Sequence, residues 1–215
     1  MGLRLGVAAA ALALTGVATA ASGEPIVRHT PADMNMASRI VLKRADLGTG
    51  WQRKPETVGG PDPELRCSYY SASDSGLVET GHASTDYKLD KQAVGSEVQV
   101  FRTVADAATS WRRNAKPALA RCTAEILRRE LAKQGIAFRV ASAKPIPFPR
   151  LTQRTAAWRI SGHVLFAGLS VPIVFDYVAL ARERTIALLS VGYDRGRPTP
   201  TEVRRLARLL AARMR

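Results

Sequence analysis

The sequence predicts an α+β domain: a single antiparallel sheet of about six strands, flanked by amphipathic helices near the N-terminus, in the middle and at the C-terminus. Two observations lead to this prediction. Apolar stretches of strand character are separated by very short connections, which is typical of antiparallel hairpins. Three other segments repeat apolar residues every three to four positions, as amphipathic helices do. Of the 215 residues, 46% are hydrophobic, so the chain can bury a real core.

The first 20 residues have the layout of a secretory signal peptide. Arg4 precedes an apolar run from Leu5 to Val17, and Ala-Thr-Ala at 18–20 is a typical cleavage sequence. The run is shorter than the roughly 20 residues of a membrane-spanning helix, although an uncleaved anchor is the alternative. We therefore expect a secreted or outer cell-envelope protein with no transmembrane segment in the mature chain. There is no cysteine near the cleavage site to which a lipid could be attached.

Residues 21–33 are polar and contain two prolines, which predicts a flexible lead-in. A single α+β domain then spans residues 34–215. Its first helix is expected to begin after Asp33 as N-cap and to end at a glycine pair, Gly48 and Gly50, with Trp51 packing beyond.

Strands are expected at 76–84 and 95–101, the second with Val98 and Val100 alternating with polar residues. Thr103 then opens a central helix through a capping-box pattern. Pro117 either kinks this helix or starts a new one. Across the proline, one apolar stripe is predicted to contain Val104, Ala108, Trp111, Ala115, Leu119, Cys122 and Ile126.

After Gly135 the pattern changes to four strands, at 136–143, 154–162, 170–180 and 184–193. The last element is a helix with a capping box at 199–202 and a proline at its first position. Its buried face is predicted to carry Val203, Leu206, Leu210 and Met214.

The chain has two cysteines, Cys67 and Cys122. In an exported protein an even number of cysteines most often forms disulfides, so we expect these two to be bridged. A reactive thiol at Cys122 is the alternative, but its position on the buried stripe, well past Pro117, lacks the helix N-terminus that activates a thiol.

Several segments together resemble a known group of exported proteins: an N-terminal helix ending "ADLGTGW", a strand ending in "VQVF" and a helix beginning "TVADAATSW". They resemble actinobacterial LpqN-type lipoproteins and the extracellular sensor domains of PknH-type kinases, over about residues 34–215. The resemblance implies a PsbP-like architecture and an exported, noncatalytic role. The chain departs from these families in having no lipobox cysteine, no kinase and a single possible disulfide, and the resemblance transfers no site residues.

No catalytic, metal or cofactor motif occurs in the sequence. His29, His82 and His163 have no ligand partner at metal spacing, and neither Ser170 nor Ser190 lies in a nucleophile elbow. Asp176 interrupts an apolar strand, which suggests a functional carboxylate in a cavity, or a side chain that points outward or pairs with an arginine. We therefore expect neither a metal nor a cofactor.

The positive charge lies in the second half of the chain. Residues 102–215 carry 22 Lys and Arg against 7 Asp and Glu, and the whole chain has a net charge of +14. Such a field attracts anions, and in an exported protein the partner is expected to be an anionic envelope polymer or lipid headgroups and not nucleic acid. Solvated surface without a dedicated partner is the alternative. The candidate anion-binding residues are Arg113, Arg121, Arg128, Arg204, Arg205 and Arg208.

The sequence therefore predicts an exported, noncatalytic domain that binds or senses a ligand in the cell envelope, with a cavity or a basic face as its site. The alternative is a small secreted hydrolase or transferase without a recognisable motif. Convergence of two of His82, His163 and Asp176 with a serine in one pocket would favour the enzyme.

Overall fold

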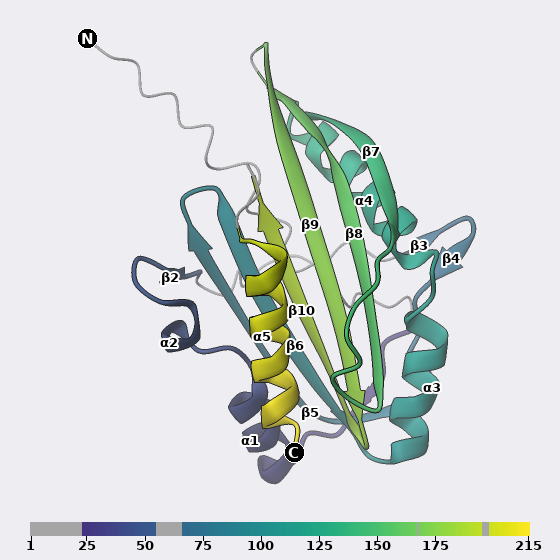
Figure 1. Ribbon diagram of the computed structural model, residues 1–215. Coiled ribbons are helices and arrows are strands. Elements are labelled where there is room, and N and C mark those ends of the chain that lie inside the picture. The colour runs from purple at the N-terminus through teal and green to yellow at the C-terminus, as the bar shows by residue number, and fades with distance from the viewer. Residues whose placement is uncertain (1–22, 55–65, 167, 195–197) are drawn as a thin grey trace.

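The computed structural model describes residues 23–54, 66–166, 168–194 and 198–215, so the signal peptide expected at 1–20 lies outside the described residues. One large sheet organises the fold (Figure 1). Its strands are β1 (Ile26–Val27), β2 (Gln52–Arg53), β5 (Val78–Leu89), β6 (Gln92–Phe101), β7 (Ala137–Pro145), β8 (Arg154–Phe166), β9 (Leu169–Arg182) and β10 (Thr185–Tyr193). Their order is β1-β5-β6-β10-β9-β8-β7, with β2 also paired to β5. A separate hairpin joins β3 (Arg66–Cys67) and β4 (Tyr70–Ser71).

The prediction of a single antiparallel sheet of about six strands was wrong in two respects. The sheet has 8 strands within the described residues, and β1 runs parallel to β5. The six longest strands, β5 to β10, are the ones that the sequence predicted, and they pair antiparallel. The two additional strands have 2 residues each, too few to show any periodicity. One of them, β1, falls in the segment expected to be a flexible lead-in.

Five helices flank the sheet within the described residues: α1 (Pro31–Ile40), α2 (Arg44–Leu47), α3 (Val104–Asn114), α4 (Leu119–Lys133) and α5 (Pro200–Arg213). The expected first helix is therefore two helices, and Thr30, not Asp33, caps its start. Asp33 instead forms an ion pair with Arg184, 3.1 Å between Oδ1 and Nη2. Hydrogen bonds from Arg184 are the main reason that the pKa of Asp33 is lowered.

The helical conformation is interrupted around Pro117, between α3 and α4. The proline therefore separates two helices and does not kink a continuous one. Thr103 accepts a hydrogen bond from Asp106 N at 3.0 Å and so caps α3. The predicted apolar stripe is correct for Ala108, Cys122 and Ile126, but Val104 is 53% exposed. Val104 is the first residue of α3, where the helix has only begun to lie on the sheet.

Two layers of helices enclose the sheet, one on each face. Side chains of α1 and α5 form one core with β5, β6, β9 and β10, and those of α4 form a second core with β7, β8 and β9 on the other face. Gly81 lets α1 approach β5, because a Cβ there would clash with the backbone of Asp33. Figure 1 shows α5 in front of the sheet and α4 behind it. Within the described residues, no helix has the length and hydropathy needed to cross a bilayer.

Candidate binding cavity

A cavity lies between the sheet and the helices α3 and α4. Strand alternation determines which side chains form its floor, because every second side chain of a strand points to the same face. On this face β6 contributes Glu97 and Gln99, and the neighbouring strands contribute the rest of the floor. These residues are Ile186 and Leu188 from β10, Tyr177 and Ala179 from β9, and Trp158 from β8.

Helices and one hairpin cover this floor. From α3 come Ser110, Trp111 and Asn114, and the break before α4 adds Ala115; Leu119 and Thr123 follow on α4. Tyr70, Ala72 and Asp74, on β4 and just after it, close one side. The space open to the centre of a water-sized sphere is about 80 Å³. One water needs roughly 10–15 Å³ by this measure, so the cavity has room for a small molecule.

A disulfide holds the hairpin that walls the cavity. Cys67 on β3 is bonded to Cys122 on α4, with their Cα atoms 5.7 Å apart. This bond confirms the pairing predicted from the sequence. Because Tyr70 pairs with Cys67 across the hairpin, the disulfide anchors the hairpin that carries Tyr70 to the helix that covers the cavity.

Two aromatic residues of the cavity donate hydrogen bonds to backbone carbonyl groups between α3 and α4. Tyr70 Oη donates to the carbonyl oxygen of Asn114 at 2.8 Å, and Trp158 Nε1 donates to that of Lys116 at 3.1 Å. The last carbonyls of a helix lack partners within it, so these bonds stabilise the end of α3 and fix both rings. Burial raises the pKa of the Tyr70 phenol, which therefore stays protonated and able to donate.

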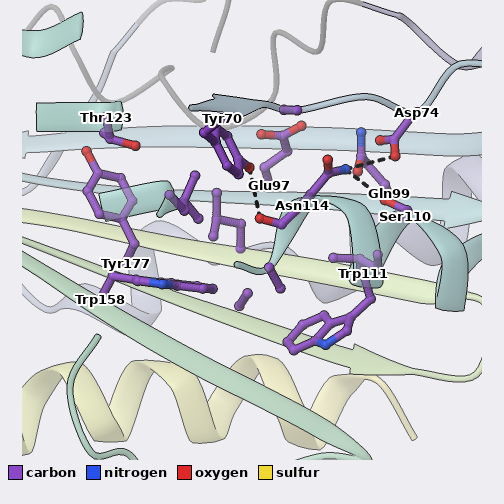
Figure 2. A pocket seen from close by; sticks show the side chains of 16 residues that line it. Tyr70, Asp74, Glu97, Gln99, Ser110, Trp111, Asn114, Thr123, Trp158 and Tyr177 are labelled. Carbon is purple, nitrogen blue, oxygen red and sulfur yellow. Dashed lines mark hydrogen bonds between the residues drawn. The ribbon is translucent and has the colours of Figure 1, made fainter. Parts of the chain in front are cut away.

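One end of the cavity carries a buried acid and amide group. Asn114 Nδ2 donates to Asp74 Oδ1 at 2.9 Å and lies 3.3 Å from Ser110 Oγ. Asp74 is 4% exposed, and burial raises the pKa of its carboxyl. Gln99 lies in the same part of the cavity (Figure 2). The Gln99 amide has no hydrogen-bond partner among the residues that the structure describes, although Gln99 is only 8% exposed.

The other end of the cavity carries hydroxyl groups. Tyr177 lines the cavity, and its side chain extends toward Thr123 (Figure 2). Tyr177 is 7% exposed, and within the described parts of the chain its hydroxyl makes no hydrogen bond. Burial raises the pKa of this phenol, so it too stays protonated. Buried polar groups normally have partners, so Tyr177 and Gln99 are places where a ligand or water would bond.

The residues that would indicate an enzyme are not brought together. Asp176 lies on the face of β9 opposite Tyr177 and accepts two hydrogen bonds from Arg159, at 2.6 and 2.7 Å, and one from Tyr193. His163 faces away from Trp158 and is exposed. His82 lies beside Glu79 and Glu97, 3.6 and 3.9 Å from their carboxylates. Asp176 is therefore the partner of an arginine, and in the described part of the chain it does not share a pocket with His82 or His163.

The six candidate anion-binding arginines lie on two sides of the molecule. Arg204, Arg205 and Arg208 are exposed on α5, which packs on one face of the sheet. Arg113, Arg121 and Arg128 belong to α3 and α4 on the other face. Figure 2 shows α5 below the strands and the cavity above them. The two groups of three therefore form no continuous surface.

Three of these arginines contact other residues of the chain. Arg113 Nη1 donates to the carbonyl oxygen of Ser75 at 2.9 Å. The guanidinium of Arg121 lies 5.2 Å from the centre of the Tyr69 ring, a cation–π contact. Arg205 Nη2 donates to the carbonyl oxygen of Asp46 at 2.9 Å.

No protein-family model matches the chain, and no curated protein matches it. Among solved structures, the chain is similar to the extracellular domain of PknH from Mycobacterium tuberculosis, with a TM-score of 0.47 and 13% identity over 86% of this chain and 98% of that chain. It is also similar to LpqN, involved in cell envelope biogenesis of Mycobacterium tuberculosis, with a TM-score of 0.31 and 10% identity over 75% and 73% of the two chains. Both proteins belong to the groups that the sequence resembles, and with TM-scores below 0.5 neither match carries a further conclusion about this chain.

The sequence suggested a cavity or a basic face as the site, but it did not indicate which residues would line a cavity. Glu97 and Gln99 alternate with Val98 and Val100, a pattern that usually means a polar, solvated strand face. Here α3 and α4 cover that face and leave a gap. The one available signal was the pair of polar residues on one side of this strand, followed immediately by a helix that carries a serine, Ser110.

Proposed function

We propose that the protein is an exported, noncatalytic binding domain that holds a small, mostly apolar ligand in the cavity between the sheet and the α3–α4 pair. The observation that carries the proposal is that Gln99 and Tyr177, which are 8% and 7% exposed and make no side-chain hydrogen bond among the described residues, line a largely apolar space. Ligand pockets combine apolar walls with a few such polar groups. The separation of His82, His163 and Asp176 supports a binding role over catalysis.

Binding is expected to be visible in tryptophan fluorescence. Trp111 and Trp158 line the cavity, whereas Trp51 is buried in the core on the other face of the sheet. Titration with a short neutral amphiphile such as 1-hexanol should change the emission of the wild type and of Trp51→Phe. The response should shrink in Trp158→Phe, because that ring contacts the cavity.

A cavity-filling substitution tests the location. Ala179→Leu adds volume on the floor and is expected to weaken 1-hexanol binding at least about tenfold by calorimetry without lowering the melting temperature. Ala212→Leu, on the exposed side of α5, is the matched control and should bind as the wild type does. Unchanged affinity in Ala179→Leu, or no response of the wild type to any amphiphile, would contradict the proposal.

For the positive charge, we propose that Arg204, Arg205 and Arg208 on α5 form a surface that binds anionic headgroups. Planar guanidinium groups suit phosphate and carboxylate. Changing all three to glutamate is expected to abolish retention on anionic phospholipid vesicles, with only a small fall in melting temperature, because the side chains are exposed and, among the described residues, only the Arg205 contact with Asp46 is lost. Retention of the wild type should also fall steeply with salt, since the Debye length is about 8 Å at physiological ionic strength.

The matched control makes the same charge change on the opposite face. Arg121, Arg128 and Arg129 are exposed on α4, and their triple change to glutamate should leave most retention intact. Equal loss in both triple variants would indicate net charge alone. A wild type that is not retained even at low salt would mean that the arginines are only solvated.

A further inference from the structure

The charges that line the cavity have the opposite sign to the charge of the protein. The chain has a net charge of +14, yet the two charged residues among those lining the cavity are both acidic, Asp74 and Glu97. Among the residues that the structure describes, neither a lysine nor an arginine belongs to this lining. A fatty acid or phosphate would therefore bring a negative charge next to carboxylates in a space of low dielectric, where repulsion is strong.

The register of the strands gives the distance between the two polar ends of the cavity, one at Gln99 and the other at Tyr177. Gln99 on β6 pairs with Ile186, whereas Tyr177 pairs with Ser190, which lies opposite Gly95. The ends are thus four residues apart along the strands, about 13 Å at the usual rise per residue. Figure 2 shows Asp74, Gln99, Ser110 and Asn114 at one end and Thr123 and Tyr177 at the other, with Glu97 between them.

The space between the ends is apolar and partly aromatic. Ala179, Ile186 and Leu188 form the floor there, and Ala115 and Leu119 lie above them. The rings of Trp111 and Trp158 also line the cavity. Indole rings attract cations through their π faces, which adds to the attraction of the carboxylates.

We infer that the cavity selects a short linear amine: a positively charged amino group is held among Asp74, Glu97 and Gln99, an alkyl segment lies over the apolar floor, and a hydrogen-bonding group reaches Tyr177 and Thr123. This inference rests on the proposed binding function and specifies the class of ligand. An ammonium group has three donors and no acceptor, which matches two carboxylates and an amide oxygen. The Tyr177 hydroxyl can donate to or accept from the far end of the ligand.

The test compares probes with the same alkyl chain and different end groups. Calorimetry on the purified protein at pH 7 would measure binding of 1-hexylamine, 1-hexanol and hexanoate. We expect hexylamine to bind at least about tenfold more tightly than hexanoate, because a charge-assisted hydrogen bond in a buried site contributes about that factor. Glu97→Gln and Asp74→Asn keep the size of the side chains and should each reduce the ratio of hexylamine affinity to hexanoate affinity, which is measured within each variant.

Two further comparisons locate the effect. Glu125→Gln removes the same charge from the outer side of α4, where Glu125 accepts a hydrogen bond from Tyr69, and should keep the preference. Tyr177→Phe should lower the affinity for 6-amino-1-hexanol several-fold relative to the affinity for hexylamine, since only the amino alcohol can bond to the phenol.

The outcomes separate the inference from the proposed function. If hexanol binds but hexylamine binds no better than hexanoate, the inference is wrong and the binding function stands. If the amine preference persists unchanged in both Glu97→Gln and Asp74→Asn, the amine lies elsewhere and the inference is again wrong. If none of the probes binds, the cavity is not a binding site and both fail.

Discussion

Replacing Cys67 and Cys122 together by alanine is expected to lower the free energy of unfolding by about 4 kcal/mol, the largest effect of any substitution considered. The disulfide closes a loop with a sequence separation of 55 residues, and without it the unfolded chain regains that entropy. In a domain of this size, about 4 kcal/mol lowers the melting temperature by roughly 8–16 °C. Guanidinium denaturation followed by circular dichroism would measure the change.

The bond should also matter for the cavity. Without it, the hairpin that carries Tyr70 is held to α4 and α3 only by noncovalent contacts, so ligand affinity is expected to fall as well. The single variant Cys67→Ala removes the same bond and should lose nearly the same stability as the double variant. A loss below about 1 kcal/mol in the double variant, or two freely alkylatable thiols in the native protein, would contradict this account.

Removing Arg159 is expected to destabilise the fold by about 3 kcal/mol, because it leaves a buried carboxylate without its charged partner. Asp176 has a side chain 1% exposed and lies 2.6 Å from Arg159 Nε, while Tyr193 donates to it from 3.1 Å. Arg159→Met keeps most of the side-chain packing and removes the charge. Chemical denaturation measures the loss.

A double variant tests whether the unpaired buried charge causes the loss of stability in Arg159→Met. Arg159→Met with Asp176→Leu removes both charges and should recover most of the stability, since replacing a buried ion pair by apolar residues is often nearly neutral. Arg139→Met, at an exposed position on the neighbouring strand β7, is the control and should change the free energy of unfolding by less than about 0.5 kcal/mol. A double variant as unstable as Arg159→Met alone would show that the charge is not the cause.

Local signals made part of the fold predictable. The start of α5 was correct because its determinants lie within four residues: Thr199 N donates to Glu202 Oε2 at 2.6 Å, and Glu202 N donates back to Thr199 Oγ1 at 3.3 Å. The six long strands were correct because each is long enough to show its pattern. In contrast, β1 exists only because Ile26 N meets the carbonyl oxygen of Leu77 at 2.8 Å, a distant contact that no local pattern encodes.

The candidate site was harder to predict, since it depends on which face of the sheet each helix covers. Cys67 and Cys122 could be paired by elimination. The arginines of α4 and α5 could not be placed, because amphipathicity states which side of a helix is buried but not which sheet face buries it. For the same reason, the polar residues Glu97 and Gln99 could be assigned to one side of β6 but not to a cavity.

The cover of the cavity, which includes the interruption between α3 and α4, comes from a different part of the chain than the floor. The cover is mostly one contiguous segment, residues 104–133, whereas the floor comes from four strands held by backbone hydrogen bonds. Substitutions at Trp111, Leu119 or Thr123 can therefore reshape the cavity without shifting the register of any strand. A protein engineer could retarget such a domain by exchanging this single segment, and natural variation confined to it could diversify ligands on an unchanged scaffold.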